Sequence, residues 1–125
     1  MPFARWVFLI AGVYGVLAIA PMYFLESRFP AEAPPAITHP EFFYGFIGVT
    51  LAWQFAFLVI ALDPPRYRLL MLPAMFEKFS FTAAATVLML QGRLPGMVFG
   101  FALLDFLLGA LFVIAFVKTQ PMKPA

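Results

Sequence analysis

The stretch MLPAMFEKFSFTAAA, residues 71–85, places Glu77 and Lys78 inside an apolar run. The run covers about 69–90, and an α-helix needs roughly 20 residues to cross a hydrocarbon core. If this helix crosses a membrane, two charged side chains lie within the membrane and need partners there.

Three further apolar runs of similar length occur in the chain. They cover about 3–25, 41–62 and 95–117. Segments that span a membrane are helices or strands of closed barrels, and these runs lack the alternation of apolar and polar residues that barrel strands show. The sequence therefore predicts an all-α, polytopic membrane protein whose 125 residues form one domain with four transmembrane helices.

The composition also indicates a membrane protein. Apolar residues make up 64% of the chain and charged residues 11%, whereas a soluble domain averages about 45–50% and about 25%. The lipid bilayer is therefore the expected surroundings of the chain. The basic residues are scattered, so we predict no binding of nucleic acid. There is no cysteine, which excludes disulfides and thiolate metal sites, and we expect no cofactor.

The first run has features of a cleaved signal peptide. Arg5 precedes an apolar stretch, and Ala18-Ile19-Ala20 resembles a cleavage site. Pro21 follows immediately and would obstruct a peptidase, and the apolar stretch is long for a signal. We therefore expect this run to be a retained helix.

The connections between the runs predict how the helices are arranged. Short linkers make sequential helices antiparallel neighbours, which gives an up-and-down bundle. Gly92 is expected to cap the third helix, and Pro95 to lie near the first turn of the fourth.

Basic residues indicate the orientation of the bundle, because cytoplasmic loops carry an excess of lysine and arginine. One side of the predicted membrane holds five basic residues: Arg5, Arg66, Arg68, Lys118 and Lys123. The other side holds two basic and three acidic residues: Arg28, Arg93, Glu26, Glu32 and Glu41. Both termini are therefore predicted to be cytoplasmic.

Polar side chains of three helices are predicted to meet inside the bundle. At 1.5 Å per residue, Gln54 and Glu77 lie roughly 12 Å from the cytoplasmic ends of their helices, and Asp105 roughly 19 Å. Adjacent helical residues point about 100° apart, so Glu77 and Lys78 are expected to face different partners. We predict that Lys78 pairs with Asp105. Three groups are candidates for Glu77: Gln54, Thr50 and Tyr14.

Two interpretations of this polar cluster remain open. Charged residues inside a membrane often mark a proton relay or a polar substrate site. The same residues would also serve as a clamp that fixes the packing of the helices. Lys78 has a third option, since its long side chain can extend toward a headgroup region.

Small residues and one proline mark predicted helix contacts. Gly96 and Gly100 form a GxxxG motif, and Gly109 follows at helical spacing, so this face is expected to contact the bundle or a second copy of the chain. Pro73 precedes Glu77 by about one turn and is expected to kink the helix there.

His39 lies beside Glu41, near the outer end of the second helix. A single histidine with one carboxylate supplies too few ligands for a closed metal site. We expect an exposed or helix-capping histidine and no metal.

Three segments, DPPRYRLLMLPAMFEKFSF (63–81), LQGR (90–93) and LLDFLLGALFVIAFVKT (103–119), carry a resemblance to a known family. They resemble small bacterial membrane proteins of the DoxX-like kind, through span count, length and the Asp-Pro, Glu-Lys and Asp arrangement. The resemblance covers helices two to four. It implies a four-helix bundle in the bacterial inner membrane and no particular reaction.

Three functional hypotheses follow. The first is a non-enzymatic membrane protein that binds a partner protein or a small apolar or lipid ligand, with the polar cluster organising the bundle. The second is a small, oligomeric, proton-coupled transporter or channel in which Glu77 or Asp105 titrates. The third is a membrane enzyme or redox subunit that handles a lipid or quinone. The three hypotheses differ in what occupies the interior of the bundle at the depth of Glu77: packed side chains, water or a ligand.

Overall fold

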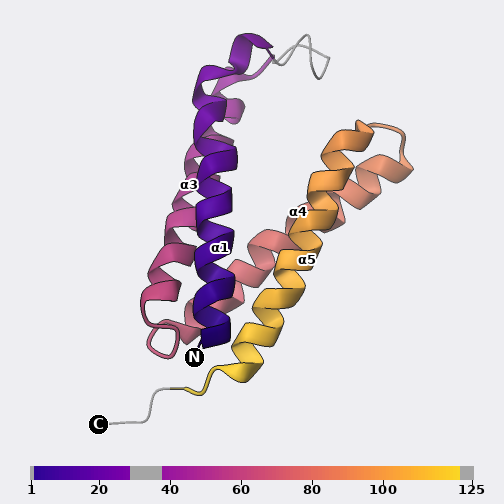
Figure 1. Ribbon diagram of the computed structural model, residues 1–125. Helices are drawn as coiled ribbons and strands as arrows, with labels where there is room; N and C mark the ends of the chain where they lie inside the picture. The colour runs from indigo at the N-terminus through magenta and orange to yellow at the C-terminus, as the bar shows by residue number, and fades with distance from the viewer. Residues whose placement is uncertain (1, 29–37, 122–125) are drawn as a thin grey trace.

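The computed structural model describes residues 2–28 and 38–121, and its regular elements in these ranges are all helical (Figure 1). Four long helices are present there: α1 (Pro2–Ile19), α3 (Pro40–Leu62), α4 (Met71–Leu90) and α5 (Gly96–Lys118). Three short 3-10 turns accompany them: η1 (Ala20–Phe24), η2 (Glu26–Arg28) and η3 (Arg68–Leu70). The all-α prediction is confirmed for this part of the chain.

Proline and glycine determine two of the helix ends. Pro21 has no backbone N–H and cannot continue the α-helical bonding, so α1 ends at Ile19 and the chain goes on as η1. Gly92 has a φ of +69°, which favours glycine. The Gly92 N–H donates to the Met89 carbonyl and the Arg93 N–H to the Leu88 carbonyl, at 3.0 and 2.9 Å. This is a Schellman cap, as predicted for Gly92.

The helices form two antiparallel hairpins that diverge like the arms of a V. In Figure 1, α1 lies along α3 and α4 along α5, while the start of α1 and the end of α5 lie at the same end of the molecule. Contacts between α1 and α5 join the hairpins, whereas α3 and α4 barely touch. The chain keeps the predicted up-and-down order, but the evenly packed bundle opens into two arms.

A group of three phenylalanine rings closes the end where the hairpins meet. Phe8 of α1 stacks on Phe112 of α5 at a centroid distance of 4.2 Å, and Phe57 of α3 meets Phe112 edge-on at 5.0 Å. All three rings are fully buried. Aromatic pairs with such geometry add about 0.5–1.5 kcal/mol each to the effect of burial. The hydrophobic core therefore lies at one end of the V.

Arg68 joins the start of α4 to the end of α5 near this core. Its Nε donates to the carbonyl oxygens of Phe116 and Thr119, at 3.3 and 2.7 Å. Its guanidinium lies 3.7 Å from the centroid of the Phe116 ring. A cation here satisfies carbonyls that the end of a helix leaves unpaired and complements the helix dipole.

Three helical segments are long and apolar enough to cross a membrane: Phe3–Phe24, Pro40–Leu62 and Gly96–Lys118. Only 28%, 28% and 22% of their apolar windows are buried inside the protein. Soluble monomers rarely expose apolar patches of this extent, so the exposed surface indicates a membrane protein. The 20 residues of α4 are a sufficient length, but this helix, which contains Glu77 and Lys78, is not among the three segments.

Of the three predicted glycine contacts, the one at Gly109 is present within the chain. A Cβ atom on Gly109 would lie 2.7 Å from the ring of Phe79, so α5 approaches α4 closely there. At Gly96 and Gly100, a Cβ atom would have no neighbouring side chain or other helix within 4 Å, so their contact with the bundle is not made. The alternative, contact with a second copy of the chain, stays a prediction. These two glycines lie on the part of α5 that extends into the open end of the V.

The loss of a hydrogen bond that would cause a kink at Pro73 does not occur. Pro73 is the third residue of α4, which continues without a break from Met71 to Leu90. In the first turn of a helix the backbone N–H has no intrahelical partner in any case. A proline at this position therefore removes no hydrogen bond from the helix.

Gly15 allows α1 to approach the side chain of Gln54 on α3. A Cβ atom on Gly15 would overlap the Gln54 amide and lie 2.7 Å from its Cγ. We expect Gly15→Ala to lower the free energy of unfolding by about 1–3 kcal/mol, the usual effect of overpacking. Thermal unfolding in detergent measures it. Gly100→Ala is the matched control, and equal melting temperatures for the two variants would contradict the contact.

Candidate functional site: a crevice with a charged floor

The diverging hairpins enclose a crevice of about 690 Å³, within the range of about 300–1,000 Å³ that is typical of ligand pockets. Each helix contributes a stripe of residues at helical spacing, so that one face of the helix lines the crevice. The stripe of α3 is Phe46, Thr50 and Gln54, and that of α5 is Met97, Phe101 and Asp105. The stripe of α4 includes Glu77, Phe81 and Ala84. That of α1 includes Tyr14 and Ala18, and Met22 of the following turn η1 continues it.

The lining changes from polar to apolar along these stripes. Gln54 and Asp105 lie at the inner ends of the stripes on α3 and α5, and Phe46 and Met97 lie about two turns nearer the mouth. At 1.5 Å per residue, eight residues correspond to roughly 12 Å. The crevice therefore has a polar floor beneath walls that are mainly apolar.

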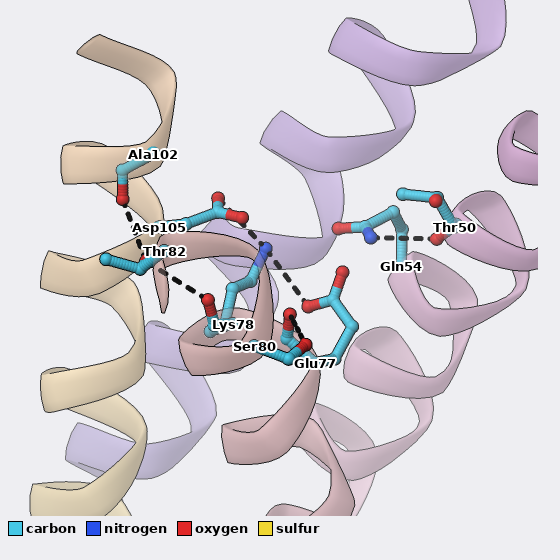
Figure 2. Close-up of polar contacts among 8 residues, drawn as sticks. All are labelled: Thr50, Gln54, Glu77, Lys78, Ser80, Thr82, Ala102 and Asp105. Carbon is cyan, nitrogen blue, oxygen red and sulfur yellow. Dashed lines mark hydrogen bonds and ion pairs between the residues drawn. The ribbon is translucent and has the colours of Figure 1, made fainter. Parts of the chain in front are cut away.

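Lys78 is the centre of the floor. The residue is buried, with only 4% of its surface exposed. Its Nζ lies 3.5 Å from Oε2 of Glu77 and 3.5 Å from Oδ1 of Asp105 (Figure 2). The same ammonium lies 5.2 Å from the centroid of the Phe57 ring, which belongs to the closed end. Lys78 is thus held between two carboxylates, directly beside the aromatic core.

The predicted pair of Lys78 and Asp105 is present, but the prediction of separate partners is wrong for Glu77. The lysine side chain is long enough to reach its neighbour although the two residues point in different directions on α4. Distances of 3.5 Å are long for hydrogen bonds. Attraction between opposite charges therefore accounts for most of both contacts.

Gln54 does not bond to Glu77 as predicted. Its Nε2 donates instead to the Thr50 carbonyl oxygen, at 2.8 Å, one turn earlier on the same helix. No hydrogen bond joins Glu77 to Thr50 or Tyr14 either, although all of these residues line the crevice. Two buried acceptor atoms are left without a hydrogen-bond partner among the described residues, namely Oε1 of Gln54 and Oε2 of Glu77.

Two residues near the floor are absent from the sequence-based predictions. The Thr82 hydroxyl lies 3.0 Å from the Ala102 carbonyl oxygen on α5 and 3.2 Å from that of Lys78, and it can donate to either. Thr82 follows Lys78 by four residues, a spacing that places both on one face of the helix. Phe57, three residues after Gln54, supports the ammonium through its ring. Helical spacing from the polar residues would have found both.

His39 lies outside the crevice. Its Nδ1 is 3.0 Å from Oε1 of Glu41, both side chains are exposed, and the imidazole stacks on Phe42 at 4.9 Å. His39 occupies the N-cap position of α3, but its side chain makes no capping hydrogen bond. The predicted exposure is confirmed and capping by the side chain is not. No group of three or more potential metal ligands is found among the described residues.

Comparison with known protein families, curated proteins and solved structures finds no match to this chain. The resemblance to DoxX-like proteins therefore remains a prediction from the sequence.

The two carboxylates beside Lys78 predict a non-additive effect on stability. Glu77→Gln and Asp105→Asn each leave the ammonium one counter-charge, whereas the double variant leaves it none. We expect the double variant to lose at least about 1 kcal/mol more than the sum of the single variants, because residues in one charge network couple. A double-mutant cycle of unfolding in detergent measures the difference. Additivity within about 0.5 kcal/mol would contradict the shared role.

Proposed function

We propose that the chain crosses the membrane four times, with both termini cytoplasmic, and that the crevice binds an amphiphilic, lipid-like ligand. Three helical segments have the length and composition of membrane spans. The fourth, α4, is antiparallel to α5 and packs along it. Its charged Lys78 side chain is buried between helices and does not face lipid, which supports insertion of α4 despite its charges.

The combination of an apolar wall with a polar floor supports an amphiphile as the ligand. A hydrocarbon chain would lie against residues such as Phe46, Phe81 and Phe101, and a polar head would reach Gln54 and Glu77. Pockets for small molecules commonly combine an apolar lining with a few polar groups that fix orientation. The observation that carries the proposal is therefore the position of the charged cluster at the base of an apolar crevice.

The closed end favours binding over transport. A transporter exposes its site alternately to the two sides of the membrane. Here Phe8, Phe57 and Phe112 pack against one another beneath Lys78, so the site would open to the second side only if this core separated. The contacts therefore support a binding protein, which is the first of the functional hypotheses.

The proposed topology predicts which loops react from outside the cell. The chain has no cysteine, so single substitutions give unambiguous labels. Gln91→Cys lies between α4 and α5, and Arg66→Cys between α3 and α4. We expect a membrane-impermeant maleimide to label Gln91→Cys in intact cells and Arg66→Cys only after permeabilisation. Labelling of both loops from one side would rule out a crossing by α4.

The proposed ligand site predicts where an amphiphile binds. We would reconstitute the protein in phosphatidylcholine nanodiscs with dodecanol and dodecylamine that each carry a photoreactive diazirine. Ala84 lines the crevice, whereas its neighbour Ala83 is not among the lining residues. We expect Ala84→Trp to reduce cross-linking to crevice peptides several-fold by filling the space, with Ala83→Trp as the matched control. Equal yields for the two variants would contradict binding in the crevice.

A further inference from the structure

The amide of Gln54 presents an acceptor that no group of the described chain satisfies. The residue is only 1% exposed, and its Nε2 donates to the Thr50 carbonyl oxygen. In the opposite amide orientation, the amide oxygen of Gln54 would face the Thr50 carbonyl oxygen, and two acceptors would meet. The hydrogen bond therefore identifies Oε1 as the free atom of the amide. Figure 2 shows the free oxygen on the side away from Thr50, toward the cluster around Lys78, and it lies against Gly15 of α1.

Glu77 provides a second acceptor on the same floor. Its Oε2 is buried and has no hydrogen-bond partner, although the ammonium of Lys78 lies 3.5 Å away. In Figure 2 the Glu77 carboxylate lies between Lys78 and the amide of Gln54. Buried polar groups are normally hydrogen-bonded, and both unsatisfied atoms here are acceptors. A matching ligand must therefore supply hydrogen-bond donors.

The charge of the floor favours a cation. Glu77 and Asp105 in their ionised forms carry two negative charges, and Lys78 supplies one positive charge between them. No other charged side chain lines the crevice in the part of the chain that the structure describes. One negative charge is left without compensation at a site with apolar walls, where charge interactions are stronger than in water. An anionic head would meet repulsion from both carboxylates.

We propose that the crevice selects a lipophilic amine in its ammonium form. The N–H groups of the head would donate to Gln54 Oε1 and to the Glu77 carboxylate, and its hydrocarbon part would lie along the apolar walls. A quaternary ammonium carries the charge but no N–H donor, and an alcohol carries a donor but no charge. The inference rests on the proposed function, because it specifies the ligand of that same crevice.

The test compares heads on one hydrocarbon chain. Unlabelled dodecylamine, dodecanol and dodecyltrimethylammonium compete with the photoreactive dodecylamine for cross-linking in phosphatidylcholine nanodiscs. The concentration of each competitor is given as its mole fraction in the bilayer, which is measured with empty nanodiscs. We expect dodecylamine to compete at least about tenfold better than either other compound, since a hydrogen bond or ion pair to a charged group commonly contributes that much.

Three variants connect the preference to the floor. Glu77→Gln removes the uncompensated charge, and we expect it to reduce the preference for the amine over the alcohol to about twofold or less. Gln54→Glu adds a negative charge at the free acceptor, and we expect a larger preference. Glu41→Gln removes an exposed carboxylate outside the crevice and should leave the preference unchanged. The opposite directions for Glu77→Gln and Gln54→Glu separate recognition of charge from loss of folded protein.

The outcomes distinguish this inference from the proposed function. Equal competition by amine and alcohol, with Ala84→Trp still reducing the cross-linking, would overturn the cation preference and leave an amphiphile site in place. Equal competition by the primary and quaternary ammonium would overturn the role of the N–H donors. An unchanged preference in Glu77→Gln would overturn the role of Glu77. Failure of both photoreactive compounds to label the crevice would overturn the proposed function itself.

Discussion

The packing of Phe8, Phe57 and Phe112 holds the two helical hairpins together at one end, and the remaining architecture depends on it. The three rings come from α1, α3 and α5, and they are fully buried. Toward the other end α3 and α4 barely touch, so no comparable core opposes the separation of the hairpins. The crevice is the space that this one-sided packing leaves, and Lys78 lies at its floor with its Nζ 5.2 Å from the Phe57 ring of the packed end.

The charged cluster places Lys78 between two side chains of opposite charge. A charge near the centre of a membrane costs about 2.5–3.5 kcal/mol on insertion scales, so in the proposed topology Lys78 would need counter-charges from its own protein. It finds them in Glu77 and Asp105, which lie on adjacent helices of one hairpin. Gln54 lies across the crevice on the other hairpin. The floor thus contains a charged side, in which Glu77 Oε2 lacks a hydrogen-bond partner, and a neutral side, in which Gln54 Oε1 lacks one.

Sequence reasoning predicted the elements better than their arrangement. Apolar runs, together with Gly92 and Pro21, account for the helices and their ends. Depth counting and the choice of polar partners selected six residues that all line one crevice. Helical periodicity tells which residues share a face, but not which helix that face meets. The open space beside Gly96 and Gly100 follows from the splay of the hairpins, which no local pattern specifies. The reach of Lys78 back to Glu77 depends on a side-chain conformation, and residue spacing does not predict it.

The open crevice and the unsatisfied acceptors explain each other. If the hairpins were packed together along their whole length, Gln54 Oε1 and Glu77 Oε2 would be sealed in an apolar interior, and each unsatisfied group would cost about 1–3 kcal/mol. Replacing Gln54 by an apolar residue would then be the more stable solution, because partly satisfied polar networks are worse than apolar cores. Both atoms belong to side chains that line the open crevice, so a donor from outside the chain would reach them after a local side-chain movement. Gln54 is almost completely buried, with its amide oriented by Thr50 and accommodated by Gly15. Its free acceptor is what the proposed recognition of a ligand would use.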